Sequence, residues 1–361
     1  MCTAQKPKGL AALRCDRVKV AGAGEEARET IPVSISINDV ARVAGVSKST
    51  VSRVIGGGAV SAEVRARVEA AIAQTGYRLN LQARRLRSRH SGIVGVIVAD
   101  IRNPFFTALI RAVEAVAYQQ GLRVMLCNTD EDPSREALYL QMMQEERISG
   151  LIFAPTRTTV GRLERMQWDY PTVLVDRAPA SGRHDSVVID NAAAMTELVG
   201  HLLAQGYRRI GGLFGSTSTT ATERRDGYLA AMQAHGLAPD YREIEPTAEA
   251  AIATVGPWLA QPDRPRALVT SNNLLLMGAL RAARAATLSI PDQLALAGFD
   301  NERWTELVEP GISVVEQPVE EMGRAAMSLL LERMKSPELP VRRLVMATRC
   351  VLRGSTGAMQ P

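Results

Sequence analysis

The chain has 361 residues, of which 46% are hydrophobic and 22% are charged, an ordinary composition for a globular protein with more than one domain. No apolar run reaches the roughly 18 to 20 residues that a membrane helix needs, and residues 1–33 lack the continuous apolar stretch of a signal peptide. We therefore expect neither a membrane protein nor a secreted one. The four cysteines have no metal spacing and are expected to be free thiols in a reducing cytoplasm.

The net charge of +5 is unevenly distributed along the chain. Residues 37–90 contain ten basic and three acidic residues, whereas the sequence after His90 is mildly acidic. A basic segment next to an acidic body is typical of a localised site for a polyanion such as nucleic acid. Residues 1–34 show no hydrophobic period, and we interpret them as a disordered tail, as the product of a start codon assigned too far upstream, or as a source of extra phosphate contacts.

The basic segment begins with a pattern of two short helices joined by a glycine turn. Apolar residues at three-to-four spacing predict a first helix from Ile37 to Ala44, which Ser36 or Asn38 can cap. Gly45 suits the turn that follows, and Ser47 can cap a second helix. Because the second helix would expose basic and hydroxyl side chains, the pattern predicts a helix-turn-helix that reads DNA.

The run DVARVAGVSKSTVSRVI resembles the DNA-binding headpiece of the lactose-repressor and galactose-repressor (LacI/GalR) family of bacterial transcription regulators. The family's third helix is matched by VSAEVRARVEAAIAQTGY and its hinge by NLQARRLRS, and the similarity extends over residues 37–354. The resemblance implies a division of the chain into an N-terminal tail, a headpiece, a hinge helix, a bilobed effector-binding and dimerisation domain and a C-terminal tail, at residues 1–34, 35–79, 80–90, 91–354 and 355–361.

Within this family, the second helix and the hinge contact operator DNA. On the second helix Arg53 can pair with a guanine, whereas lysine and serine contacts are less selective. In the hinge, Leu86 occupies the position of a leucine that wedges between base pairs in the minor groove, although a leucine there can also simply pack on its own domain. Leu79 departs from the proline usual in the family. The expected DNA-binding residues are Lys48, Ser49, Thr50, Ser52, Arg53, Asn80, Ala83 and Leu86.

From Gly92 onward, short apolar runs alternate with amphipathic helical stretches, which predicts parallel sheets covered by helices on both faces. The βα units are too many for one compact sheet, so we expect a two-lobed α/β body similar to periplasmic binding proteins. The resemblance places crossings between the lobes near Asp190 and near residues 317–318, and it implies that a helix at 319–334 returns to the first lobe. The runs are GIVGVIVA, RVMLCN, GLIFAP, PTVLVD, SVVID, RIGGLFG, RALVTS, LALAGFD and ISVVEQ.

Ligands of open α/β sheets bind beyond the carboxyl ends of the strands, so the residues after each run are candidates for effector binding. By resemblance, Asp300 would accept hydrogen bonds from sugar hydroxyls and Arg224 would reach polar groups of the effector. Asn273 replaces an aspartate common in the family. The motif NPFF is also typical of the family, although its phenylalanines can be plain core residues. The expected effector-binding residues are Phe105, Phe106, Asn128, Arg157, Arg177, Arg224, Asn272, Asp300 and Trp304.

The resemblance implies a homodimeric repressor of a carbohydrate or sugar-acid operon, released from a pseudo-palindromic operator by a small sugar-type ligand. Residues 304–324 resemble regulators of gluconate and 2-ketogluconate, and Arg157, Arg177 and Arg224 would suit a carboxylate ligand. A purine-like co-repressor is the alternative effector. The sequence lacks a phosphate-binding glycine loop, a catalytic signature and a histidine metal spacing, so we expect no enzyme, cofactor or metal. A secreted sugar-binding protein would need a signal peptide and would have no helix-turn-helix.

Overall fold

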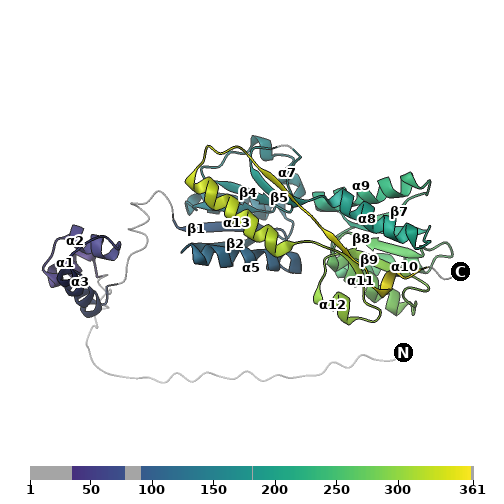
Figure 1. Cartoon of the computed structure of the whole chain (residues 1–361), viewed down its shortest axis with the longest axis horizontal. Coiled ribbons are helices and arrows are strands. Elements are labelled where there is room, and N and C mark those ends of the chain that lie inside the picture. Colours follow the sequence, from purple (N-terminus) through teal and green to yellow (C-terminus); the bar gives the residue numbers. More distant parts are fainter. Residues whose placement is uncertain (1–34, 78–90, 181, 359–361) are drawn as a thin grey trace, which may run out of the picture. The chain divides into compact units, whose positions relative to one another are not determined.

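The computed structural model describes residues 35–77, 91–180 and 182–358. The chain separates into two compact units, a headpiece of three helices and a larger body that begins with β1 (Figure 1). The expected hinge contacts Asn80, Ala83 and Leu86 lie outside the described residues. No helix in the described ranges is both long and apolar enough to cross a membrane.

The headpiece consists of α1 (Ile37–Ala44), α2 (Lys48–Ile55) and α3 (Ala62–Thr75). Its small core is formed by one face of each helix, as the apolar spacing predicted. The buried residues are Val40, Ala41, Ala44, Val51, Val54, Val68 and Ala71. Ala41 is small where α1 meets its neighbours, so the short helices can approach closely around this core.

The first lobe of the body, lobe 1, is built on a parallel six-stranded sheet in the order β11-β5-β4-β3-β1-β2. Helices α5 and α13 pack side by side on one face of this sheet (Figure 1), and α6 lies on the other. The strands are β1 (Ile93–Val98), β2 (Arg123–Asn128), β3 (Gly150–Phe153), β4 (Thr172–Val175), β5 (Asp185–Ile189) and β11 (Arg343–Met346). The helices are α5 (Pro104–Gln119), α6 (Pro133–Glu145), α7 (Arg157–Val160), η1 (Leu163–Arg165) and α13 (Val319–Lys335).

The second lobe, lobe 2, has a six-stranded sheet in the order β12-β10-β9-β8-β6-β7, in which only the β10–β12 pair is antiparallel. The strands are β6 (Ile210–Gly215), β7 (Asp240–Ile244), β8 (Ala267–Thr270), β9 (Ala295–Phe299), β10 (Ser313–Glu316) and β12 (Arg349–Val351). The helices are α8 (Asn191–Ala204), α9 (Thr219–Ala234), α10 (Ala248–Leu259), α11 (Asn273–Ala285), α12 (Arg303–Leu307) and η2 (Gly354–Thr356).

In the described body the chain passes between the lobes at three places. The first two, at Asp190 and at residues 317–318, are where they were expected, and α13 returns to lobe 1 as predicted. The third, between β11 and β12, was not predicted. The nine apolar runs all form strands, which confirms the two-lobed α/β fold, and one apolar cluster continues from lobe 1 into lobe 2.

Candidate functional sites: a helix-turn-helix and a cleft between two lobes

The ends of α1 and α2 are capped by residues of the local sequence. Ser36 is the N-cap of α1, and its N–H and Oγ–H groups donate to the Asp39 carboxylate at 3.0 and 2.7 Å. These hydrogen bonds lower the pKa of Asp39. Gly45 ends α1 with φ 64°, a left-handed conformation that glycine adopts without strain. Ser47 Oγ accepts from Thr50 N–H at 3.1 Å and so caps α2 as predicted.

Helix α2 buries one face and presents the other to solvent. Val51 and Val54 are buried, whereas Lys48, Ser49 and Arg53 are exposed. The expected contacts Thr50 and Ser52 are half-buried at the edge of the exposed face. Among residues 35–77, neither Lys48 nor Arg53 forms an ion pair. This face therefore presents unpaired cationic groups beside hydroxyls, of which Ser49 Oγ lies 2.8 Å from Ser47 Oγ, and such groups read base edges and phosphates in DNA.

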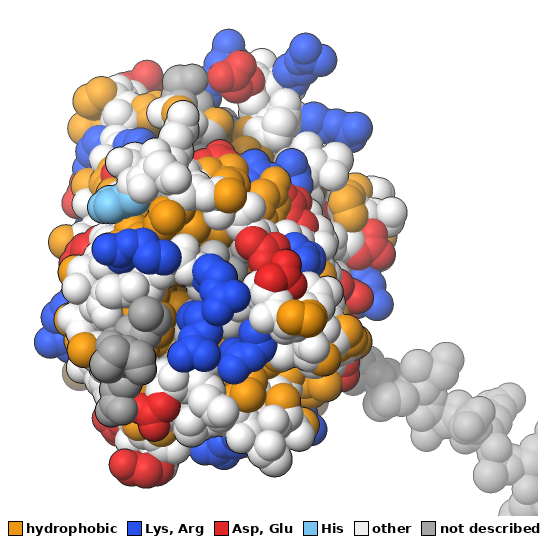
Figure 2. Space-filling view, turned by 90° about the vertical axis from the view of Figure 1, so that its right-hand side faces the viewer, with side chains coloured by type: hydrophobic (Ala, Val, Ile, Leu, Met, Phe, Trp, Pro, Cys, Tyr) orange, Lys and Arg blue, Asp and Glu red, His pale blue; other side chains and the backbone are white. Residues whose placement is uncertain are grey.

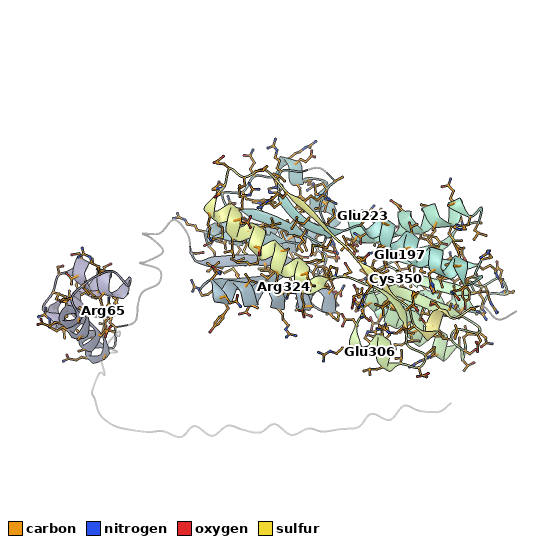
Figure 3. The ribbon with its side chains drawn as sticks, viewed as in Figure 1. Arg65, Glu197, Glu223, Glu306, Arg324 and Cys350 are labelled. Atoms are coloured by element: carbon orange, nitrogen blue, oxygen red, sulfur yellow. The ribbon has the colours of Figure 1, made fainter. Side chains whose placement is uncertain are left out.

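The loop after α2 is tied to α3 by two successive hydrogen bonds. The Arg53 carbonyl accepts from Gly58 N–H at 2.8 Å. The Gly58 carbonyl in turn accepts from the guanidinium of Arg65, labelled in Figure 3, at 3.1 Å. These contacts fix the end of α2, so the backbone that carries the exposed Arg53 is held by the fold of the headpiece.

A cleft lies between the two lobes, where the carboxyl ends of both sheets meet. Several of its lining residues directly follow a strand, namely Asp176 after β4, Ser271 after β8, Asp300 after β9 and Gln317 after β10. Such positions are where open α/β sheets bind ligands. Of the expected effector-binding residues, Phe105, Phe106, Arg177, Arg224, Asn272 and Asp300 line this cleft.

Three carboxylate residues of the cleft have left-handed backbone conformations. Glu131, Asp176 and Asp300 have φ angles of 60°, 68° and 75°. This conformation is unfavourable for residues other than glycine and costs of order 1 kcal/mol or more at each position. Backbone strain of this kind is often found at ligand-binding sites.

The guanidinium of Arg177 is already neutralised within lobe 1. Its Nη1 donates to Glu131 Oε2 at 2.8 Å and its Nη2 to Glu131 Oε1 at 2.5 Å, a bidentate ion pair. The neighbouring Asp176 is buried, and burial raises its pKa to about 6, with Asp300 and Glu131 adding to the rise and the two arginines Arg177 and Arg224 opposing it. The lobe 1 side of the cleft is therefore rich in carboxylates.

Arg224, on α9, is the cleft's main cation in lobe 2. Its side chain is buried, its Nε donates to Asn191 Oδ1 at 2.8 Å, and its Nη1 donates to the Ser271 carbonyl. The guanidinium also stacks over the ring of Phe299 at 3.9 Å. Asn191 is held in turn by Glu223, labelled in Figure 3, at 2.7 Å. Arg224 is thus fixed beside the first crossing between the lobes.

Asp300 is surrounded by amide donors that fix its carboxylate. Gln317 Nε2 donates to its Oδ1 at 2.7 Å, and Asn273 donates to its Oδ2 through both the backbone N–H and the side-chain Nδ2, at 3.2 and 3.1 Å. Because a carboxylate only accepts, Gln317 must turn its NH2 group toward Asp300 and its Oε1 away. That Oε1 is buried without a partner, so it can accept a hydroxyl from a ligand.

Phe105 and Phe106 belong both to the core of the body and to the lining of the cleft. They are 4% and 3% exposed, and their rings pack edge-to-face with centroids 5.1 Å apart. Asn272 also lines the cleft, and it caps α11 by accepting from Leu275 N–H at 2.9 Å. The plain core interpretation of the two phenylalanines therefore accounts for their burial but not for their place in the cleft.

The other three expected effector-binding residues do not line the cleft. Asn128 holds the loops after β1 and β2, because its side chain accepts from Ile101 N–H at 3.0 Å and donates to Asp130 at 2.8 Å. Arg157 is exposed and donates to the Ser216 carbonyl of lobe 2 at 3.3 Å. Trp304 packs against the apolar residues beneath α12. Glu131, Asp176 and Gln317 line the cleft instead and were not among the expected residues.

Outside the cleft, two features of the body bear on its chemistry. The face of lobe 2 turned toward the viewer in Figure 2 carries a group of arginine side chains. Cys127 and Cys350 are free thiols, and Cys350 lies beside Glu197 (Figure 3). Burial, together with Glu197, raises the pKa of Cys350 to about 12. No group of His, Cys, Asp or Glu suited to a metal ion occurs in the described parts of the chain.

Comparison with known proteins agrees with this architecture. Residues 36–80 match the family described as bacterial regulatory proteins of the lacI family, and residues 199–356 match a periplasmic binding protein-like domain. The chain is 36% identical over 330 residues to the HTH-type transcriptional regulator PtxS of Pseudomonas plecoglossicida, covering 89% of this chain and 96% of that protein. It is 34% identical over 328 residues to the ribose operon repressor of Escherichia coli K12, covering 89% and 99%.

Two solved structures extend the comparison to three dimensions. The lac repressor dimer bound to operator and the anti-inducer ONPF has a TM-score of 0.80 at 24% identity, covering 90% of this chain and 99% of that chain, which shows a shared fold. The complex of the transcriptional regulator CelR with cellobiose has a TM-score of 0.62 at 25% identity and covers 89% and 99%. The chain therefore belongs to the LacI family of bacterial regulatory proteins, and it is a DNA-binding transcriptional regulator rather than an enzyme.

Proposed function

We propose that this regulator is a homodimeric repressor that is released from a pseudo-palindromic operator when a small sugar binds in the cleft between its lobes. The observation that carries the proposal is one chain that combines an exposed basic recognition helix with a polar cleft at the carboxyl ends of two sheets. The relatives support it, since one is a ribose operon repressor and another was solved with cellobiose. Such a protein would act in the bacterial cytoplasm, where the operator lies.

The DNA-binding half of the proposal assigns roles along α2. Arg53 pairs with a guanine in the major groove, while Lys48 and Ser49 make less selective contacts with bases and phosphates. Two headpieces related by two-fold symmetry read two inverted half-sites, which is why the operator is expected to be pseudo-palindromic. The half-buried Thr50 and Ser52 supply further hydroxyl contacts at the edge of the same face.

The charge of the cleft supports an uncharged sugar more than a sugar acid. The lining contains four carboxylates, from Asp100, Glu131, Asp176 and Asp300, but only two guanidiniums. Arg177 is bound to Glu131 and Arg157 lies outside the lining, so Arg224 is the one expected arginine that remains for a ligand carboxylate. Ligand hydroxyls can instead donate to the Asp300 carboxylate and to the unpartnered Gln317 Oε1.

Release of the operator follows from a difference in ligand affinity between two relative orientations of the lobes, an open setting and a closed setting. Asp300 and Arg224 belong to lobe 2, whereas Asp176 and Arg177 belong to lobe 1, so a ligand that contacts both sides favours the closed setting. A ligand shifts this equilibrium only by its preference for one setting. The change of setting is transmitted to the hinge at residues 80–90, which lies outside the described residues.

Calorimetric titration of the purified protein tests the proposed effector class. The panel contains D-ribose, D-glucose, cellobiose, D-gluconate, 2-ketogluconate and adenine, and each compound is also titrated into Asp300→Ala. We expect an uncharged sugar to bind the parent protein and to lose at least about tenfold in affinity in Asp300→Ala, because a charge-assisted hydrogen bond is removed. Binding of gluconate or 2-ketogluconate alone would show that the cleft selects a sugar acid, and binding of adenine alone would favour a co-repressor.

A further inference from the structure

The side chain of Asn273 bridges the two lobes by contacting Asn103 and Asp300, two residues that line the cleft. In lobe 2, where it begins α11, its Nδ2 donates to Asp300 Oδ2 at 3.1 Å. The same Nδ2 donates to Asn103 Oδ1 of lobe 1 at 2.8 Å. Asn103 is the N-cap of α5, and its Oδ1 also accepts from Phe105 N–H at 3.0 Å. Two helix N-termini, one from each lobe, therefore meet at a single amide group.

The orientation of this amide is determined by its neighbours. Asp300 only accepts hydrogen bonds, and Asn103 Oδ1 must be an oxygen because it accepts from a backbone N–H. Asn273 must therefore direct its NH2 group at both, with one proton for each acceptor. Its Oδ1 is left buried without a partner, although the residue is only 1% exposed.

An aspartate, which is common at this position in the family, cannot make the same pair of contacts. A carboxylate at residue 273 would have no proton for either Asp300 or Asn103 Oδ1, and it would place a second negative charge against Asp300. Asn103 could donate to it only by turning its amide, which would remove the acceptor that caps α5. The bridge therefore depends on asparagine at this position.

We propose that Asn273 is a positioning residue that couples the Asp300 carboxylate in lobe 2 to the start of α5 in lobe 1, so that the bridge itself stabilises the closed setting of the lobes. This inference rests on the proposed function only in taking Asp300 as an effector contact. A sugar that binds Asp300 meets a carboxylate already oriented and lobes already joined, so less of its binding free energy is needed for closure.

Hydrogen exchange of the ligand-free, full-length protein tests the bridge with three substitutions. Asn273→Ala removes the bridging amide. Asn103→Ser keeps a good N-cap for α5 but is too short to reach Asn273. Asn103→Asp is the matched control, since its Oδ1 can still cap α5 and accept from Asn273. Exchange is followed by mass spectrometry in peptides covering residues 104–110 of lobe 1 and 274–280 of lobe 2.

We expect each disrupting substitution to act on the opposite lobe. Asn273→Ala should speed exchange in residues 104–110 by roughly three- to tenfold, and Asn103→Ser should do the same in residues 274–280, as expected for the loss of one hydrogen bond. Asn103→Asp should change the exchange rate of neither peptide by more than about twofold. In each peptide the double variant should exchange no faster than the single variant of the opposite lobe, because the two substitutions remove the same hydrogen bond. Effects confined to the lobe that carries the substitution, or effects that add in the double variant, would overturn the proposal.

A titration with D-ribose and cellobiose separates this inference from the proposed function. If the parent protein binds neither sugar but the cross-lobe exchange pattern is found, the coupling stands and the proposed effector class fails. If a sugar binds, Asn273→Ala and Asn103→Ser should weaken its affinity by a similar factor, roughly three- to tenfold, and Asn103→Asp should not. A loss of affinity in Asn273→Ala that is absent in Asn103→Ser would reduce Asn273 to a local support of Asp300 and would refute the bridge.

Discussion

Replacing Asp176 by asparagine should stabilise the body at neutral pH. Asp176 directly follows β4 and is 8% exposed, and burial, reinforced by Asp300 and Glu131, raises its pKa from 3.8 to about 6. The attraction of Arg177 and Arg224 is already included in that shift. A rise of about 2 pH units corresponds to roughly 3 kcal/mol, which ionised Asp176 subtracts from the free energy of unfolding at high pH.

The sign of the effect follows from the pH at which Asp176 takes up a proton in the folded and in the unfolded form. Below the unfolded pKa of 3.8 Asp176 is protonated in both forms, so its ionisation does not lower the free energy of unfolding. The destabilisation grows as the pH rises from 3.8 toward the folded pKa of about 6. Asp176→Asn carries no charge at any pH. Its free energy of unfolding should exceed that of the parent by about 3 kcal/mol at pH 7.5 and by less than about 1 kcal/mol at pH 4.

Urea unfolding at the two pH values measures this difference. Asp130→Asn is a suitable control, because Asp130 lies in the same lobe but its pKa is lowered, chiefly by a hydrogen bond from Asn128. That substitution should give a small change of the opposite sign at pH 7.5. An Asp176→Asn protein that is less stable than the parent at pH 7.5, or more stable by the same amount at both pH values, would show that ionised Asp176 does not destabilise the fold.

Further predictions concern the recognition helix, its cap and the half-buried thiol of Cys350. Arg53→Ala should weaken operator binding by about 1 to 3 kcal/mol and relax the base preference at one position of each half-site, as measured by competition with single-base variants; an equal loss for every sequence would indicate a phosphate contact. Ser47→Ala should destabilise the headpiece by roughly 1 kcal/mol in thermal unfolding, because Thr50 N–H loses its acceptor, and an unchanged melting temperature would argue against the cap. Cys350 should react with iodoacetamide at pH 8 at least about a hundredfold more slowly than an exposed thiol, and Glu197→Gln should speed the reaction; rapid labelling in the folded parent would contradict the raised pKa.

Most of the strands that the sequence revealed are buried on both faces, although the edge strand β2 was also found from its apolar run. Continuous apolar runs such as residues 93–98 and 295–299 become fully buried central strands, which their composition predicts directly. The strands β7, β11 and β12 were missed because they lie at or near sheet edges and carry charged, half-exposed residues. The third crossing between the lobes joins two of these strands, so it was missed for the same physical reason.

The cleft could be predicted in part from strand ends and family motifs. That approach located Asp300, Arg177 and Asn272, since each follows an apolar run. It could not locate Glu131, which lies three residues beyond the end of β2 and reaches Arg177 only because the loops after β2 and β4 fold toward each other. It also placed Trp304 in the cleft from its nearness to Asp300 in sequence, whereas α12 directs the indole into the apolar cluster of lobe 2.

The charge of the cleft depended on pairings that sequence alone does not reveal. Three arginines suggested an acidic effector, but the structure binds Arg177 to Glu131 and leaves Arg157 exposed with the Ser216 carbonyl. An arginine attracts a ligand carboxylate only when no carboxylate of the protein already occupies it. The proposed preference for an uncharged sugar therefore rests on these pairings rather than on residue type.

Release of DNA by a sugar tests whether this protein is a sugar-controlled repressor, and the protein can itself select the DNA that is used. Random duplexes are enriched on the full-length protein, and binding of the enriched duplex is followed by fluorescence anisotropy at fixed salt while D-ribose or cellobiose is added. We expect the enriched sequences to contain two inverted half-sites and to be released by sugar from the parent protein but not from Asp300→Ala. Enriched sequences without inverted repeats would rule out two symmetric half-sites, and release that is unchanged in Asp300→Ala would rule out control by a sugar bound to Asp300.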